Sequence, residues 1–422
     1  MIFNTAKMLI PNFNKTDKMQ NWSVVACDQY TSQPDYWNRV KNRVDGFKST
    51  YNLVLPEVYL EDADFEQRIK KINSEIQNYI TDGVFFETEP CYIYVERTLS
   101  DGSIRHGLMG AVDLEEYNFN KGSKSKVRAT EGTVIERIPP RLKVRQNALA
   151  EFSHIMMLID DVKKEIIEPL AGKKSSFEKL YDFELMENGG KIEGYILDAD
   201  TEEFVKSKLK ALDDIDAFNK KYGVSEENAL VYAVGDGNHS LATAKTNYEN
   251  YKKQVGDETA KASPARYALA ELVNLHDNSL VFEAIHRVVF DVDENNFITE
   301  LKKYYNVGET PDNADAQKIV LLTDGKEQTV YIQNPSYNLA VGSIQAFIDE
   351  YLTKFGGKVD YIHGADTVRE LTVKGCVGII LDAMEKSSLY KTVIVDGSLP
   401  RKTFSMGEAY DKRYYLEGRK IK

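Results

Sequence analysis

Cysteine is scarce in this chain of 422 residues, and its scarcity excludes several classes of protein. The cysteines lie far apart and form no CxxC pair, which argues against a disulfide framework and against a structural zinc site. No apolar run approaches the ~18 residues that a membrane-spanning helix needs, so we expect no membrane partner. The segment Met1 to Asn21 lacks the apolar stretch of a signal peptide, and we therefore expect a cytoplasmic protein.

Positive charge is also in deficit, because the formal net charge is −12 at pH 7. A chain this acidic binds nucleic acid poorly, so we expect no nucleic-acid partner. The sequence contains no P-loop, no GxGxxG fingerprint, no HExxH motif and no GxSxG elbow. Without an HExxH motif, the sequence does not identify a metal. Without a GxSxG elbow, it gives no support for a nucleophilic hydrolase.

The order of apolar patterns predicts a mixed α/β protein. Apolar residues recur at helical spacing over 64–80, and charged amphipathic residues predict one helix over 200–222. Residues 91–114 and 318–332 each predict a hairpin around a turn, the second one centred on Asp324. A compact series of short elements follows residue 292. We therefore expect an N-terminal region over 1–292 and a C-terminal α/β subdomain over 293–422.

The most informative segment is the one in which a strand pattern ends at a glycine turn and a helix pattern begins at once. Glycine lets the backbone approach a ligand closely, and the unpaired N–H groups of a new helix attract an anion. The candidates for phosphate binding are therefore the turn residues Gly235, Gly237, Asn238 and Ser240. Asp236 is a candidate base or Mg²⁺ ligand, and His239, as a neutral ring, is a candidate for proton transfer. An ordinary strand-to-helix turn would explain the same spacing.

A second feature is a basic segment inside this acidic chain. Eight positive and two negative side chains fall between residues 121 and 145. Two prolines at 139 and 140 predict a helix that begins near Arg141. A solvated loop and helix would account for these charges, and the alternative is a patch that neutralises a phosphorylated ligand. From this segment we select Glu131, Arg141 and Arg145 as ligand-binding candidates.

Further candidates lie outside these two segments. Asp28 follows a short predicted strand over 22–27 and is a second candidate base or Mg²⁺ ligand. His286 and Arg287 lie on a predicted strand over 281–292. His286 is a candidate for proton transfer, with a purely structural histidine as the alternative, and Arg287 is a candidate for neutralising phosphate. Lys402 belongs to a second group of cations over 400–413. We expect the cations of 121–145 and 400–413 to converge on the Gly235 turn.

Four segments occur in an order that resembles a known family. They are Ala26-Cys-Asp-Gln-Tyr-Thr-Ser-Gln-Pro-Asp-Tyr-Trp37, Arg128-Ala-Thr-Glu-Gly-Thr-Val with Ile138-Pro-Pro-Arg141, Gly235-Asp-Gly-Asn-His-Ser-Leu-Ala-Thr-Ala244, and Leu399-Pro-Arg-Lys-Thr-Phe-Ser405. On these segments, the chain resembles the bacterial and archaeal family called domain of unknown function 1015. The resemblance spans nearly the whole chain. That family has no secure activity, so the resemblance does not settle the function.

The glycine turn also looks like the phosphate-binding turn of the ParB and sulfiredoxin-like fold. This likeness implies a ParB-like core with an added C-terminal α/β subdomain, and proteins of that fold include partition-protein nucleotidases, sulfiredoxin and free-serine kinases. Many members of the resembled family have Asp-Gly-His-His-Arg at the turn, whereas this chain has Asn238 and Ser240 in place of the first histidine and the arginine. Loss of the arginine removes a bidentate phosphate clamp, so the positive charge must come from elsewhere.

The residues and the resemblance together predict a small-molecule phosphoryl-transfer enzyme that binds a nucleotide or a phosphorylated metabolite. The reaction we expect first is phosphoryl transfer like that of a free-serine kinase. Such an enzyme would use Mg²⁺ and ATP or ADP. One alternative is a phosphatase that acts on a small phosphomonoester such as phosphoserine. Another is a non-catalytic nucleotide-sensing or ParB-like binding protein. The oligomeric state stays unknown.

Overall fold

The computed structural model describes residues 1–12, 16–120, 122–152, 154–323 and 325–422. They form two compact units, one made of Met1–Leu280 and Glu408–Lys422 and the other of Val281–Gly407. The boundary falls after residue 280 rather than after 292, and the last segment of the chain belongs to the first unit. Both units contain helices and sheets, so the mixed α/β fold expected from the sequence is confirmed.

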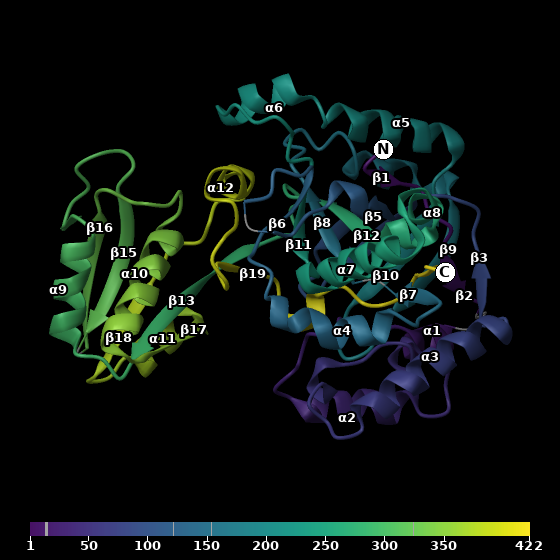
Figure 1. The fold of residues 1–422 in the computed structure, drawn as a ribbon, viewed down its shortest axis with the longest axis horizontal. Coiled ribbons are helices and arrows are strands. Elements are labelled where there is room, and N and C mark those ends of the chain that lie inside the picture. The colour runs from purple at the N-terminus through teal and green to yellow at the C-terminus, as the bar shows by residue number, and fades with distance from the viewer. Residues whose placement is uncertain (13–15, 121, 153, 324) are drawn as a thin grey trace. The chain divides into compact units, whose positions relative to one another are not determined.

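A nine-stranded sheet forms the middle of the first unit (Figure 1). Its strands, in spatial order, are β6 (Val127–Ala129), β11 (Tyr232–Asp236), β8 (Met156–Ile159), β12 (Tyr267–Asn274), β5 (Ile104–Asp113), β4 (Ile93–Thr98), β10 (Lys191–Ile196) and β9 (Glu178–Glu184), with β1 (Phe3–Asn4) paired to β5. The strand β11 is parallel to β6 and antiparallel to β8. The predicted hairpin over 91–114 is present as β4 and β5.

A four-stranded sheet joins distant parts of the chain within the first unit. Its order is β3 (Phe85–Glu87), β2 (Leu9–Pro11), β20 (Gly418–Lys420) and β7 (Ala150–Phe152). The C-terminal strand β20 is therefore internal to this sheet. The predicted strand over 22–27 is not formed, because Trp22 ends a helix and Val25 makes an isolated bridge to Tyr414.

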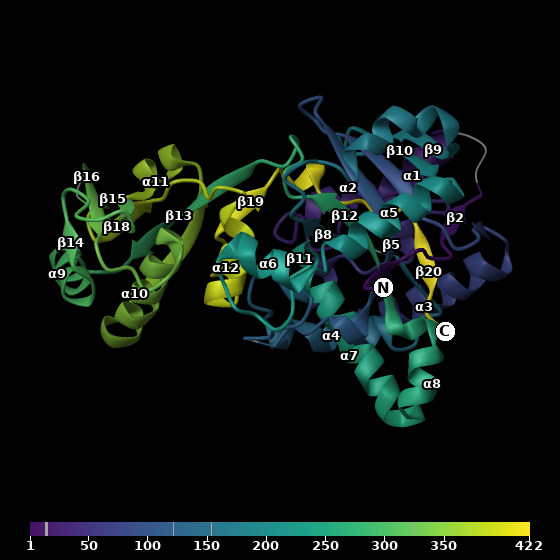
Figure 2. The same ribbon diagram turned by 90° about the horizontal axis from the view of Figure 1, so that it is seen from above.

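Helices cover both sides of the large sheet in the first unit. Figure 1 shows α5 and α6 above that sheet and α2 and α3 below it, and Figure 2 gives the perpendicular view. The helices are α1 (Thr16–Trp22), α2 (Pro34–Val44), α3 (Phe65–Thr81), α4 (Ile138–Arg145), α5 (Ala199–Ala211), α6 (Ile215–Tyr222), α7 (Asn238–Val255) and α8 (Asp257–Ala262). The single helix predicted over 200–222 is two helices, because the Asp214 carboxylate accepts the N–H groups of Asp216 and Ala217 and starts a new helix there. None of the described helices is long and apolar enough to cross a membrane.

The second unit is a sheet with helices packed on its two faces. Its strands are β14 (Val307–Gly308), β16 (Lys326–Ile332), β15 (Gln317–Thr323), β18 (Cys376–Ile380), β13 (Phe282–Phe290), β17 (Lys358–His363) and β19 (Phe404–Met406), and its helices are α9 (Glu294–Tyr304), α10 (Ala340–Phe355), α11 (Ala365–Leu371) and α12 (Ser388–Asp396). Neighbouring strand residues alternate between two buried clusters: Val289 packs with α9 and α10, whereas Val288 packs with α11. The residue predicted at the turn between β15 and β16, Asp324, lies outside the described residues.

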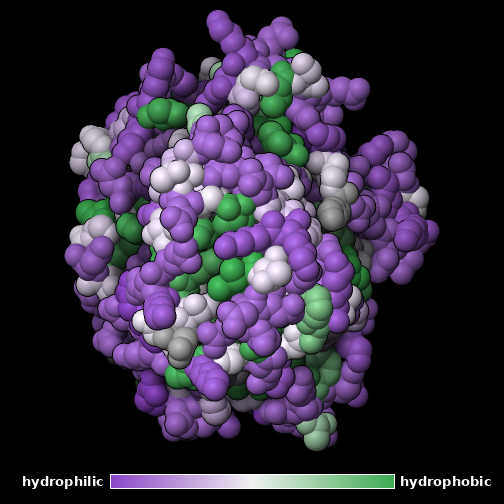
Figure 3. Space-filling view, turned by 90° about the vertical axis from the view of Figure 1, so that its left-hand side faces the viewer, coloured by the Kyte–Doolittle hydropathy of each residue, from purple (hydrophilic) through white to green (hydrophobic). Residues whose placement is uncertain are grey.

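Hydrophobic residues are sparse on the face of the molecule that Figure 3 shows. That face is mostly hydrophilic, with hydrophobic residues in small, separate patches. Scattered patches of this kind are ordinary on a folded surface and do not by themselves indicate a partner.

Candidate functional site

The glycine turn connects a strand to a helix, as its sequence predicts. The strand β11 ends at Asp236, and α7 begins at Asn238 and continues for 18 residues. Gly237 has φ +81° and lies against Ile155, so a Cβ at this position would be both strained and crowded. The first N–H groups of α7 have no partner within the helix, and the helix dipole favours negative charge near them.

The loop after β6 lies beside this turn. The Thr130 hydroxyl donates to the carbonyl oxygen of Val234 at 2.7 Å, and the Val134 N–H donates to Nε2 of His239 at 3.3 Å. An Nε2 that accepts a hydrogen bond carries no proton, which agrees with the neutral His239 ring expected at this helix start. Glu131 belongs to the same loop, between Thr130 and Val134, and its role stays a prediction.

Two oxygen atoms at the turn are buried without a hydrogen-bond donor. Asp236 Oδ1 accepts the Gly237 N–H at 2.9 Å, but Asp236 Oδ2 and Asn238 Oδ1 have no hydrogen-bond partner. Buried acceptors in native proteins are normally satisfied, so these two oxygens call for a donor or a cation. Carboxylate and amide oxygens are ligands that Mg²⁺ accepts.

A cavity of about 140 Å³ lies next to this turn, between α4 and α7. Arg141, Val144 and Arg145 line it from one face of α4, at helical spacing, and Ser240 and Thr243 line it from the start of α7. The remaining wall is largely apolar and includes Leu53, Val54, Leu55, Leu60, Ile76, Ala148, Ala150, Phe152 and Ile155. The cavity thus offers two guanidinium groups and a helix N-terminus within an apolar enclosure.

Both arginines of the cavity are held by carboxylates. Arg141 is paired with Glu57. Arg145 is 2.5 Å from Oε2 of Glu151, whose Oε1 is 3.1 Å from the buried Arg419. Burial alone would raise the pKa of Glu151, but the charges of Arg145 and Arg419 hold that pKa below its ordinary value.

The sharing of Glu151 leaves positive charge beside the cavity. Two guanidiniums and one carboxylate carry one net positive charge, and the Leu269 N–H also donates to Glu151 at 2.9 Å. The Nε of Arg145 is buried and has no hydrogen-bond partner. This group can therefore bind an anion more readily than a simple ion pair could.

A second polar wall of the cavity contains Cys27, His154 and Tyr415. Nε2 of His154 is 3.4 Å from the Ser240 hydroxyl, and the Tyr415 hydroxyl donates to the Cys27 sulfur at 2.9 Å. Asp28 follows Cys27, and its burial alone would raise its pKa. The charge of His154 and a hydrogen bond from the Gln29 amide outweigh that effect, so the pKa of Asp28 is lowered.

Most other cations of the basic segment have partners away from this cavity. The pairs are Lys124–Glu226, Lys126–Asp213, Arg128–Glu226 and Lys143–Glu66. Lys121 lies outside the described residues. Arg413, from the C-terminal group of cations, is buried between Glu271 and Glu417. Among the described cations of 121–145, Arg141 and Arg145 are therefore the ones that line the cavity.

Three further candidates belong to the second unit. His286 accepts the Leu381 N–H at 3.2 Å, and burial, followed by the charge of Arg287, lowers the pKa of His286. Arg287 is buried, donates to Gln345 at 3.2 Å and lies over the Tyr361 ring. Lys402 has a positive φ of 58°. His286 and Arg287 are buried on β13, and Lys402 lies in the connection between α12 and β19. The roles assigned to these three residues stay predictions.

Sequence reasoning missed His154, Glu57 and Tyr415. No local motif marks His154, which is 86 residues away from Ser240 in the sequence. The spacing of Arg141, Val144 and Arg145 on a short helix is the one signal that could have identified a charged cavity face.

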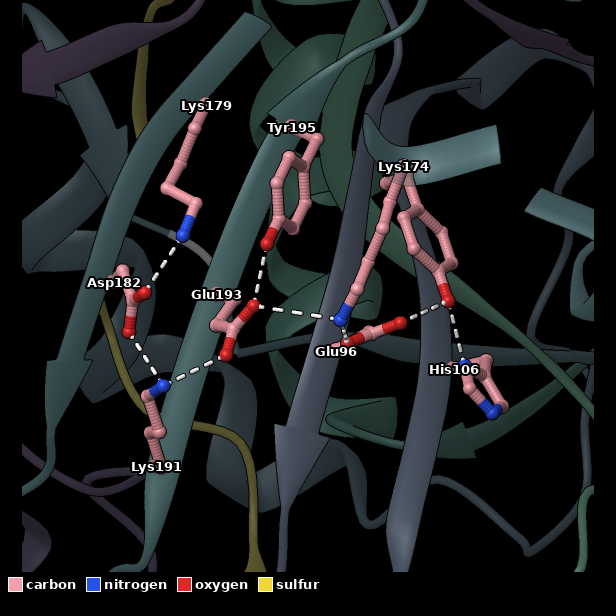
Figure 4. A network of polar contacts seen from close by, with 9 residues as sticks. Glu96, His106, Lys174, Lys179, Asp182, Lys191, Glu193 and Tyr195 are labelled. Atoms are coloured by element: carbon pink, nitrogen blue, oxygen red, sulfur yellow. Dashed lines mark hydrogen bonds and ion pairs between the residues drawn. The ribbon is translucent and has the colours of Figure 1, made fainter. Parts of the chain in front are cut away.

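A separate set of charges crosses the outer strands of the large sheet. Figure 4 shows lysine side chains that point to carboxylates on β4, β9 and β10, with His106 at one end of the network. The Tyr94 hydroxyl connects Glu96, at 2.9 Å, to His106, at 2.7 Å. The ion pairs of the network are Lys174–Glu96, Lys174–Glu193, Lys179–Asp182, Lys191–Asp182 and Lys191–Glu193. Positive and negative groups alternate and neutralise one another, which indicates a structural role for this network.

The model of the family described as "Protein of unknown function (DUF1015)" matches residues 11–351. No curated protein matches the chain.

Several solved structures are distantly similar. A mutant free serine kinase in complex with ADP is 10% identical, with 74% of this chain and 91% of that chain covered and a TM-score of 0.39. A conserved hypothetical protein from Pyrococcus furiosus is 10% identical, with 72% and 93% covered and a TM-score of 0.35. SbnI from Staphylococcus aureus, truncated at its C-terminus, is 9% identical, with 71% and 83% covered and a TM-score of 0.35. At these values the likenesses assign no activity to this chain.

Proposed function

This chain belongs to the DUF1015 family of proteins of unknown function, and from its own site we propose that it is a phosphoryl-transfer enzyme acting on a small phosphorylated ligand. The ligand would occupy the cavity between α4 and α7, with its phosphoryl group near Arg141, Arg145 and the first turn of α7. A nucleotide such as ATP or ADP is the proposed donor, and a small hydroxyl compound such as serine is the proposed acceptor.

One observation carries this proposal: two arginines from one helix and the start of another helix line the same cavity. Phosphoryl transfer is catalysed mainly by positioning and by positive charge around the transferred group. Guanidinium groups hold phosphate oxygens in a bidentate way, and helix N–H groups add further donors. The arginine that the glycine turn itself lacks would thus be replaced by the two arginines of α4.

The turn residues also fit a Mg²⁺ ion. Asp236 Oδ2 and Asn238 Oδ1 are buried oxygens without a hydrogen-bond donor, and they would be the protein ligands. When bound, Mg²⁺ supplies positive charge that stabilises the charge developing on phosphate oxygens. Asp28, whose lowered pKa keeps it ionised at neutral pH, is the proposed proton acceptor for a substrate hydroxyl.

Isothermal titration tests whether the cavity binds phosphate groups. We expect phosphoserine or ADP to bind the full chain in the presence of Mg²⁺, and R145Q to weaken that binding roughly 10- to 100-fold, because one charged hydrogen bond contributes about 1.5–3 kcal/mol. In R145Q, Glu151 keeps Arg419 as its partner, so the variant leaves no unpaired buried carboxylate.

Two further variants complete this test. The double variant R141Q/E57Q removes the other arginine together with its carboxylate, and it should weaken binding similarly. The matched control is K143Q, which removes a cation from the same helix; Lys143 is half exposed, pairs with Glu66 and does not line the cavity. An equal loss in K143Q, or no binding of phosphoserine, ADP or ATP by the unaltered chain, would contradict the proposal.

The acceptor decides whether the enzyme is a kinase or a phosphatase. Transfer to water releases inorganic phosphate, whereas transfer to a small alcohol yields a new phosphomonoester. Product analysis with ATP and serine, with and without the serine, separates the two forms of the proposal.

A further inference from the structure

A serine and a histidine from distant parts of the sequence meet in the wall of the cavity. Ser240 Oγ is 3.4 Å from Nε2 of His154, and both residues line the cavity. His154 is only 3% exposed and lies in the loop between β7 and β8. A hydroxyl within reach of an imidazole nitrogen is the arrangement that activates serine as a nucleophile, and such contacts are often long before substrate binds.

The surroundings of this pair suit a phosphoryl group bound at Ser240. Arg141 and Arg145 line the same cavity, and Ser240 lies in the first turn of α7, where the helix dipole favours negative charge. The Asp28 carboxylate lies close enough to His154 to interact with it electrostatically, so an acid, an imidazole and a hydroxyl are grouped in this wall. The rings of His154 and Tyr415 also pack edge to face, with centroids 5.1 Å apart, which limits the orientations of His154.

We infer that Ser240 is the nucleophile of this site and His154 its general base, so that phosphoryl transfer proceeds through a covalent phosphoryl–Ser240 intermediate. This inference rests on the proposed function and goes beyond it, since direct transfer from donor to acceptor would need no covalent intermediate. The apolar wall of the cavity would hold the organic part of a small phosphomonoester.

The chemistry consists of two displacements at phosphorus. In the first, Ser240 Oγ gives its proton to Nε2 of His154 and forms a bond to phosphorus. The bond from phosphorus to the leaving oxygen breaks, and that oxygen keeps the electron pair and takes the proton from His154. In the second, water or an acceptor hydroxyl attacks phosphorus and gives its proton to His154, which here takes the role that direct transfer would give to Asp28. The bond to Ser240 Oγ breaks, and Oγ recovers its proton.

The test uses the full chain and p-nitrophenyl phosphate, a small phosphomonoester with an aromatic leaving group. After an acid quench, mass spectrometry of the intact protein and of its peptides should show one added phosphoryl group on Ser240. Acid preserves a phosphate ester of serine and destroys phosphohistidine, so the quench distinguishes the two residues. Release of p-nitrophenol is followed in the same reaction.

Variants separate a nucleophile from a residue that merely lines the cavity. We expect S240A to lose the label and to reduce turnover by roughly a thousand-fold or more, while inorganic phosphate still binds by isothermal titration. H154Q should slow formation of the label. The control T246A removes a hydroxyl from the same helix that bonds to the Ala242 carbonyl oxygen, and it should be labelled like the unaltered chain.

The outcomes distinguish this inference from the proposed function. If phosphate binds and S240A turns over at the unaltered rate, transfer is direct; the inference is then wrong and the proposed function stands. The inference is also wrong, and the proposed function stands, if the unaltered chain binds phosphate but carries no label on Ser240. A label on another residue has the same meaning. If neither phosphate nor any phosphorylated ligand binds, the proposed function fails first and the inference fails with it.

Discussion

Cys27 lies in the cavity wall, and its surroundings keep its thiol protonated. Burial, followed by the negative charges of Asp28 and Glu57, raises the pKa of Cys27 well above its ordinary range. Because the thiolate is the reactive form, we expect Cys27 to resist iodoacetamide at mildly alkaline pH. Peptide mass spectrometry after labelling would check this, and the urea-unfolded chain, in which all three cysteines should react, is its control. Equal labelling of Cys27 in both states would contradict the environment described here.

Asp160 shows how a single carboxylate at a strand end can be structural. It follows β8 and is bonded by His276 at 2.6 Å, by Lys221 at 2.8 Å and by Tyr222. Burial alone would raise its pKa, but these partners lower that pKa from an ordinary 3.8 to about 2. The group thus adds stability that is fully present above pH 4 and is lost as the pH falls toward 2.

The variant D160N tests this pH dependence. A pKa shift of this size corresponds to about 2 kcal/mol, so D160N should lower the free energy of unfolding by about that amount at neutral pH. The difference from the unaltered chain should shrink as the pH falls toward 2. Urea unfolding at neutral pH and near pH 2 measures it, and a difference that does not change with pH would contradict the assignment.

Among secondary-structure elements, the C-terminal strand depends on a buried charge cluster that precedes it. Arg413 lies between Glu271 and Glu417, and all three are almost completely buried. Gly107 makes room for this cluster, because a Cβ there would collide with the Glu271 carboxylate. R413M would leave two carboxylates buried without their cation, so we expect it to destabilise the first unit by about 3–5 kcal/mol.

A surface ion pair provides the comparison for this prediction. R369M removes an exposed arginine that pairs with Glu327 and Asp366, and it should cost about 1 kcal/mol or less. Denaturant unfolding of both variants measures the two losses. If R413M and R369M lower the free energy of unfolding equally, the prediction that the buried Arg413 cluster contributes more to stability than the surface pair is wrong.

The elements that were predicted correctly are those whose signals are local. The apolar spacing of α3, with Ile69, Ile72 and Ile76 buried, and the glycine turn before α7 are both evident in the sequence. Long-range contacts have no such signal. The helix break at Asp214 depends on one side-chain cap, and the cavity combines α4, α7 and loops that are far apart in the sequence. For this reason the sequence predicts Arg141 and Arg145 as ligand-binding candidates but gives no sign of His154.

At the level of the whole molecule, the two units have separate cores and share one chain that leaves the first unit and returns to it. The second unit, Val281–Gly407, has its own buried clusters on both faces of its sheet. The first unit needs its last segment, because β20 is internal to a sheet and Tyr414, Tyr415 and Leu416 are buried in its core. We therefore expect the units to unfold in two separate transitions.

Truncation after Gly407 tests this division. The truncated chain should lose the cooperative transition of the first unit and keep that of the second, because the deletion removes an internal strand from one unit and nothing from the other. Differential scanning calorimetry and limited proteolysis would show which unit survives. A truncated chain that retains both transitions would contradict the assignment of residues 408–422 to the first unit.

Binding of a phosphoryl group in the cavity between α4 and α7 can be tested with a crystal of the full chain grown with tungstate, a heavy phosphate analogue. Anomalous scattering locates tungsten without any assumption about the ligand. We expect a peak inside the cavity, within hydrogen-bonding reach of Arg145, Arg141 or the first turn of α7. A peak that lies only elsewhere, with the cavity free of tungsten at saturating concentration, would contradict it.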